Sequence, residues 1–126
     1  MATSITTISA SDTGTTVVEV CNANFTKRMW PTVVSVTTTY TVLTGDSYVV
    51  LCDATGGAFT VTLPAAASST NIQVTLKKTD VSANAVTIDG DGAETIDGAA
   101  TQSLATQWKT KTLVCNGTAW FILSDL

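Results

Sequence analysis

The fold is decided by residues 59–77, which read FTVTLPAAASSTNIQVTLK. Phe59–Leu63 and Ile72–Lys77 each alternate apolar and polar side chains with a period of two, and Pro64–Thr70 forms a loop between them. This alternation gives a strand one buried face and one wet face, as is typical of antiparallel sheets. The stretch therefore predicts two half-buried strands joined by a loop.

Further strands are predicted on both sides of this stretch. They are Tyr48–Cys52, Ala85–Ile88, Trp108–Cys115 and Ala119–Leu123. Asn116-Gly117, between the last two, is a strong hairpin-turn signal. Threonine and valine, which favour strands, are frequent, and no long segment carries the apolar spacing of a helix. We therefore expect an all-β protein, with an antiparallel β-sandwich or a barrel-like body.

The first part of the chain differs from this body. It is rich in threonine and serine, with short apolar runs at Val17–Val20 and Val33–Val36. We interpret residues 1–38 as an N-terminal arm or extra strands and residues 39–126 as a compact β domain.

Within the arm, two basic residues adjoin a large aromatic ring: Lys27, Arg28 and Trp30. This combination suits docking onto an acidic partner surface, and the alternative is an ordinary solvated loop.

Charge is scarce in this chain. Charged residues make up 13% of the sequence, against about 25% in typical soluble proteins. Small proteins need polar groups to cover a large relative surface, so we expect part of the surface to be buried against other copies of the chain. The alternative explanation is the abundance of alanine and threonine. With only six basic residues and a net charge of −4, direct binding of nucleic acid is not expected.

Catalysis is not predicted. The chain has no histidine and no glycine-rich phosphate loop, so the usual nucleophilic triads and nucleotide sites are missing from the sequence. We expect no enzyme activity and no cofactor.

Four acidic residues form the remaining candidate site: Asp89, Asp91, Glu94 and Asp97. Hard cations favour such oxygen-rich clusters, but the calcium-loop pattern fails at Ala93, and aspartate-glycine turns explain the cluster equally well. Paired glycosidase carboxylates are disfavoured because no sugar-stacking aromatic residues accompany them. No metal site is therefore predicted.

The cysteines and two of the tryptophans are read as structural. Cys52 and Cys115 lie in apolar runs and are expected to be small core residues with free thiols, as is Cys21 by default. Trp108 and Trp120 flank the final hairpin and are expected to anchor the core or a subunit interface. No segment has the composition of a transmembrane helix or a secretory signal, so no membrane association is expected.

A set of ordered motifs covers about two-thirds of the chain. They are Tyr40–Val42, Tyr48–Ala54, Phe59–Ala66, Leu76–Asp80, Asn84–Asp89, Glu94–Gly98 and Asn116–Trp120. As a set, they resemble a β-rich module of tailed-phage virion structural proteins, chiefly tail fibres and capsid-associated proteins. The resemblance implies a structural role in the virion, usually as a homotrimer, with assembly in the host cytoplasm.

Two roles in the virion stay open at this point. The chain has only a short arm before the module, which favours a capsid decoration or cement protein that binds the major capsid protein in the head shell. The alternative is a short tail-fibre or host-recognition tip that contacts tail proteins or a host receptor. For the first role, Lys27, Arg28 and Trp30 are the expected capsid-contact residues.

Overall fold

The computed structural model describes residues 31–44 and 47–126, and this part of the chain is all-β. The strands are β1 (Thr32–Val36), β2 (Tyr40–Thr41), β3 (Tyr48–Cys52), β4 (Phe59–Thr62), β5 (Gln73–Lys78), β6 (Val86–Asp89), β7 (Thr101–Leu104), β8 (Thr110–Cys115) and β9 (Trp120–Asp125). The only helical segment among the described residues is the short 3-10 turn η1 (Ala66–Ser68). The prediction of an all-β protein is confirmed.

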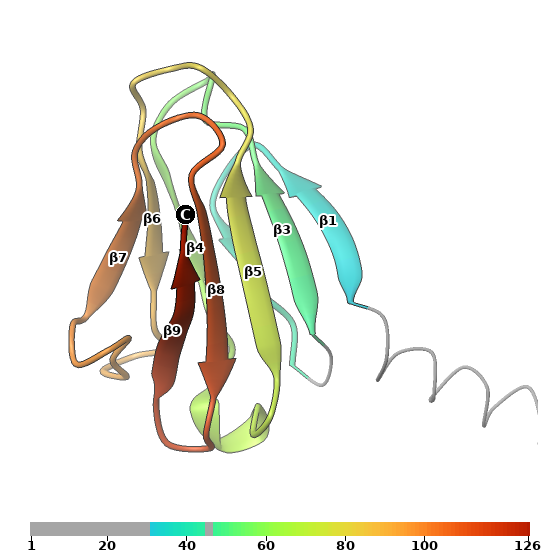
Figure 1. Cartoon of the computed structure of the whole chain (residues 1–126), viewed down its shortest axis with the longest axis vertical. Helices are drawn as coiled ribbons and strands as arrows, with labels where there is room; N and C mark the ends of the chain where they lie inside the picture. Colours follow the sequence, from blue (N-terminus) through green and yellow to red (C-terminus); the bar gives the residue numbers. More distant parts are fainter. Residues whose placement is uncertain (1–30, 45–46) are drawn as a thin grey trace, which may run out of the picture. The chain divides into compact units, whose positions relative to one another are not determined.

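The strands form two sheets (Figure 1). The five-stranded sheet has the order β1-β3-β5-β8-β9, and the four-stranded sheet has the order β2-β4-β6-β7. From β1 to β6 the chain passes from one sheet to the other at every strand, so each strand lies beside the one two places earlier. Strands that follow one another in this way run parallel, as β1, β3 and β5 do.

The last three strands, β7 to β9, do not follow this parallel pattern. Strand β7 stays in the four-stranded sheet and pairs antiparallel with β6, while β8 pairs antiparallel with β5 and β9 with β8. Both sheets are therefore mixed, and they do not close into a barrel. The prediction of an antiparallel body and its barrel-like variant are wrong. Alternating side chains report that one face is buried, and they carry no information about the direction of the neighbouring strand.

The hairpin between β8 and β9 forms where the sequence placed it. Gly117 has a φ of 94°, a value that glycine adopts without the steric cost of a Cβ atom. The Asn116 side-chain oxygen accepts hydrogen bonds from the amides of Thr118 and Ala119, each at 2.9 Å. These bonds satisfy the amides of the turn.

One core lies between the sheets, because the inward residues of both contribute to a single buried cluster. Its largest fully buried apolar side chains are Trp120, Leu63, Leu76, Ile88, Ile96, Leu104 and Leu113. The Trp120 indole N–H donates to the Pro64 carbonyl at 3.3 Å, so its polar atom is satisfied inside the core. Cys52 and Cys115 are buried in the same cluster as free thiols, as predicted.

The compact unit of described residues begins at Pro31. Strand β1, which the sequence grouped with the arm, pairs with β3 over its whole length from Thr32–Tyr48 to Val36–Cys52. Val34 and Val36 pack against the core. The body therefore extends N-terminally beyond the expected start at residue 39.

Candidate functional site

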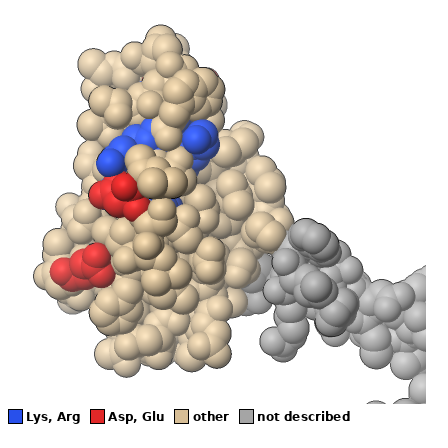
Figure 2. Space-filling model, in the orientation of Figure 1, with Lys and Arg blue, Asp and Glu red and all other residues tan. Residues whose placement is uncertain are grey.

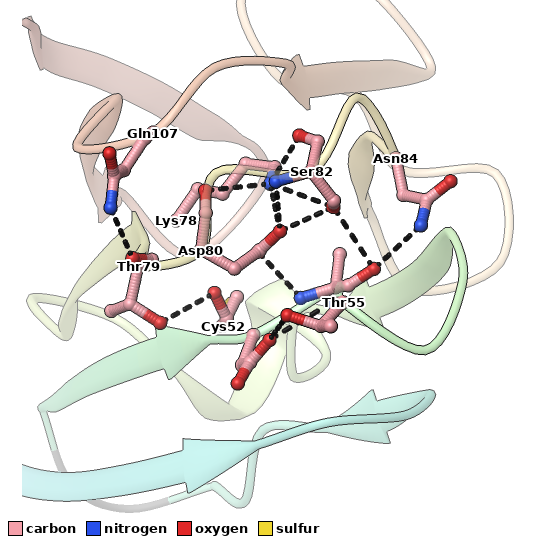
Figure 3. Close-up of polar contacts among 10 residues, drawn as sticks. Cys52, Thr55, Lys78, Thr79, Asp80, Ser82, Asn84 and Gln107 are labelled. Atoms are coloured by element: carbon pink, nitrogen blue, oxygen red, sulfur yellow. Dashed lines mark hydrogen bonds and ion pairs between the residues drawn. The ribbon is translucent and has the colours of Figure 1, made fainter.

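A buried lysine organises the loops at one end of the two sheets (Figure 3). Lys78 is the last residue of β5, and its inward position follows from the alternation that also buries Val74 and Leu76. Its side chain is fully buried. The ammonium forms an ion pair with Asp80 at 2.7 Å and donates to the carbonyls of Asp80 and Ser82, each at 3.1 Å.

The Asp80 carboxylate links this lysine to a second loop. One oxygen accepts the Ala54 amide at 2.7 Å, and the other accepts the Ser82 amide at 2.9 Å and contacts the Ser82 hydroxyl. Burial opposes ionisation of Asp80, but hydrogen bonds from Lys78, Ser82 and Ala54 outweigh it and hold the pKa of this carboxyl well below its ordinary range. Asp80 is therefore a carboxylate throughout the neutral range.

Further polar contacts extend the network across three loops. Asn84 donates to the Ala54 carbonyl at 2.8 Å, which joins the β5–β6 loop to the β3–β4 loop. The Thr79 hydroxyl donates to the Cys52 carbonyl at 3.1 Å, and Gln107 in the β7–β8 loop donates to the Thr79 carbonyl at 3.1 Å. The network therefore fixes the β3–β4, β5–β6 and β7–β8 loops relative to one another.

The chemistry of this network is structural. A lysine ammonium has three N–H donors, and those of Lys78 have acceptors in Asp80 and Ser82. Burial, with a smaller contribution from Asp80, raises the pKa of the nearby Cys52 thiol to about 12, so the nucleophilic thiolate is scarce at neutral pH. Neither group is presented as a nucleophile.

A second cluster of lysines lies near the same end of the five-stranded sheet. Asp125 of β9 pairs with Lys109 at 2.6 Å and with Lys111 at 2.5 Å. Hydrogen bonds from these two lysines lower the pKa of the Asp125 carboxyl. The ammonium of Lys77 lies 5.6 Å from the centre of the Trp108 ring, in a cation–π arrangement.

Trp108 is the most unusual residue of this cluster. It is 57% exposed, and its φ is 67°. Left-handed backbone is uncommon for any residue other than glycine, and asparagine and aspartate tolerate it better than a bulky aromatic side chain. Trp108 does not anchor the core, because the turn before β8 directs the ring to the surface, and its alternative role at a subunit interface stays a prediction. Trp120 is fully buried, as expected.

The acidic residues after β6 are engaged in separate local contacts. Both carboxylate oxygens of Glu94 accept the Ala66 amide at 3.0 Å, and Asp97 accepts the Ile122 amide at 3.1 Å. The turn is tight at Gly90, where a Cβ atom would lie 2.5 Å from the Glu94 carbonyl oxygen. Among residues 31–44 and 47–126, no three metal-ligating side chains gather to hold an ion.

The outward face of the five-stranded sheet has the opposite character to these clusters. Side chains in register across β1, β3, β5 and β8 are Val33, Val49, Thr75 and Thr112 in one row and Ser35, Leu51, Lys77 and Thr110 in the next. Figure 2 shows this side of the molecule, where the charged atoms gather in small groups and a broad surface carries none. We call the outward positions of these strands and of β9 the outer face.

The structure therefore gives a mixed result for the predicted site residues. Lys27, Arg28, Trp30 and Cys21 lie outside the described residues. Sequence reasoning missed the network around Lys78, although a signal was present: Lys78 continues the inward phase of Val74 and Leu76. It also missed the exposure of Trp108, because the sign of φ in a turn leaves no mark in a period-two pattern.

Comparison of the chain with known proteins gave no match to a family model and no significant similarity to a curated protein. In the part of the chain that the structure describes, no helix has the length and apolar character needed to cross a lipid bilayer.

Proposed function

We propose that this chain is a structural protein of a phage virion, a capsid decoration or cement protein that binds the assembled head shell as a homotrimer and reinforces it. The observation that carries the proposal is the outer face of the five-stranded sheet. This surface combines exposed Val33 and Phe121 with threonine and serine, and Lys77 is its one charged side chain on β1, β3, β5 and β8. Exposed apolar surfaces with little charge mark sites of protein association. The ordered phage-like motifs supply the virion context.

The mechanism follows from contact area and multivalency. A cement protein adds buried surface across the joints of a shell, which opposes separation of the capsid subunits. Three linked copies raise the effective concentration of each further contact, so the trimer binds more tightly than one copy without stronger individual contacts. The Lys78 network fits this role because it fixes the loops that a partner would meet.

The location of the protein on the particle tests the assignment. Gold labelling of an affinity tag in intact virions should place the protein over the head. Label confined to the tail would reject the decoration role and support a fibre tip.

A second experiment tests the contact residues. The triple variant Lys27→Glu, Arg28→Glu, Trp30→Ala should keep its oligomeric state and lose binding to empty heads in a cosedimentation assay. The matched control, Lys109→Glu, changes a lysine of the body and should bind heads like the wild type. Unchanged binding of the triple variant would exclude these three residues as the capsid contact.

A host-recognition tip is the second candidate, and Trp108 favours it. This ring is exposed in a strained backbone conformation and is flanked by Lys77. Strain of this kind is often retained where a side chain must be presented to a partner. If this role is right, Trp108→Asn should abolish adsorption of the protein to host cells.

A further inference from the structure

We propose that the outer face of the five-stranded sheet is the surface through which copies of this chain meet, with three copies turning this face toward a common axis. The inference rests on the proposed homotrimer and assigns its interface. It is carried by the juxtaposition of Val33, Val49, Leu51, Val114 and Phe121 on one sheet face that has almost no charge.

Registration places these apolar side chains side by side. Val33 lies opposite Val49 on the neighbouring strand, and Val114 lies opposite Phe121. Val33 is 61% exposed and Phe121 is 40% exposed. Leu123, also exposed, lies at the β-bulge between β8 and β9, where the register shifts beside Thr112. The apolar positions therefore lie on both sides of the sheet, on β1 and β3 and on β8 and β9, and the outward positions of β5 between them are Gln73, Thr75 and Lys77.

The electrostatics of the face favour a second copy of the same chain as the occupant. In a symmetric assembly each charge approaches its own copies, and like charges repel. One row of the outer face holds valine and threonine alone, and the next holds Ser35, Leu51, Thr110 and the ammonium of Lys77, which lies beside Trp108. Most of the acidic side chains, including Asp53, Asp89 and Asp91, lie outside the five-stranded sheet. The face can therefore meet itself without repulsion, whereas an acidic or basic partner would find little to pair with.

The size of the face sets the area that copies of the chain can bury against one another. Five strands spaced about 4.8 Å apart, each spanning about 17 Å, give a flat area of about 400 Å². Two such faces that meet in one contact bury about 800 Å², the upper range of non-specific crystal contacts, and three faces around one axis bury about 1,200 Å² divided among three contacts. These flat areas are lower limits, because side chains add accessible surface.

Val49→Glu tests the proposal in the full-length protein. Val49 lies in the second strand of the sheet on its outward side, so the variant brings carboxylates together at the axis without entering the core. Light scattering after size exclusion should give the wild type the mass of three chains and shift Val49→Glu toward the monomer. The dissociation constant should rise more than about a hundredfold, because like charges at an interface cost several kcal/mol.

A matched control and a rescue separate interface effects from misfolding. Val81→Glu places the same charge at a residue that is 80% exposed in the β5–β6 loop, away from the outer face, and should remain trimeric. Circular dichroism and thermal melting should show that both variants fold. Mixing Val49→Glu with Val49→Lys should restore association that neither variant shows alone.

Other outcomes would overturn the proposal. These are a monomeric wild type, a folded Val49→Glu variant that associates like the wild type, or equal loss of association in Val81→Glu. A monomer would reject the interface and the homotrimer together. A trimer that depends on Val49 but does not bind heads would retain the interface and reject only the decoration role, so the two failures are distinguishable.

Discussion

The Lys78 network and the outer face lie on the same sheet and reverse the usual distribution of charge. At the loop end, a lysine that is fully buried pairs with Asp80 among backbone groups from three loops. On the outward side, valine, leucine and phenylalanine face solvent in the described chain. Buried charge here fixes the loops, while the outward face of the same sheet carries apolar side chains and little charge.

Substitution of the neighbouring residues Lys78 and Lys77 should give the largest difference in stability between the buried network and the outer face. Lys78→Met should lower the free energy of unfolding by about 3–5 kcal/mol, because it leaves the buried Asp80 carboxylate without its cation. Lys77→Met, one residue earlier on the outer face, removes a cation–π contact that is worth about 0.5–1 kcal/mol. It also removes long hydrogen bonds to the Trp108 carbonyl and the Thr110 hydroxyl, at 3.4 and 3.3 Å. Urea denaturation of both variants measures the difference. Equal losses would show that burial of Lys78 does not determine its contribution.

Neighbouring valines sharpen the same comparison at smaller cost. Val50 is fully buried and Val49 points outward from the same strand. Val50→Thr should lower stability by about 1–3 kcal/mol because its hydroxyl enters the apolar core. Val49→Thr should change the stability of the monomer by less than about 0.5 kcal/mol. Chemical denaturation at low protein concentration compares them without a contribution from association. A larger loss at Val49 would contradict the assignment of the two faces.

Trp120 and Trp108 extend the comparison to backbone strain, because one is buried in the core and the other is exposed with a positive φ. Trp120→Ala should cost about 3–5 kcal/mol because Trp120 fills the core. Trp108→Gly should stay within about 1 kcal/mol of the wild type, since relief of the positive φ offsets the lost contact with Lys77. Thermal unfolding of both variants checks this. A loss of several kcal/mol in Trp108→Gly would mean that the ring stabilises the body, which would weaken its case as a residue held for recognition.

Acid titration tests the contribution of the ionised Asp80 carboxylate to the stability of the network. The pKa of Asp80 is lowered by folding, so its contribution to stability is complete above its ordinary pKa near 3.8 and is lost as the pH falls through the folded pKa. The stability of the wild type should therefore decline below about pH 4, and the decline should be shallower in Asp80→Asn. Asp53 and Asp125 also have lowered pKa values and remain in both proteins, so the difference in slope isolates Asp80. Parallel slopes would exclude an ionised Asp80 as a source of stability.

Local patterns predicted the strands well and their partners poorly. Tyr48–Cys52 is a strand with the predicted bounds, and Asn116-Gly117 forms the predicted hairpin turn. Strand β7 was not predicted, because Thr101–Leu104 has a single buried side chain and therefore little apolar alternation. The candidate site was harder to predict than the strands, because Lys78, Asp80 and Ala54 come together only when separate loops meet.

By itself, the sequence determined that the chain forms strands with one buried face, because side-chain alternation is a local property of the backbone. It also determined the scarcity of charge and the turn at Asn116-Gly117. Only the tertiary structure decided that β1, β3 and β5 run parallel and that Lys78 forms a buried ion pair with Asp80. It also decided that no other segment of the described chain covers the outer face. These features depend on which distant segments become neighbours. Strands pair through backbone groups that all residues share, so the packing of the whole core selects the partner of each strand.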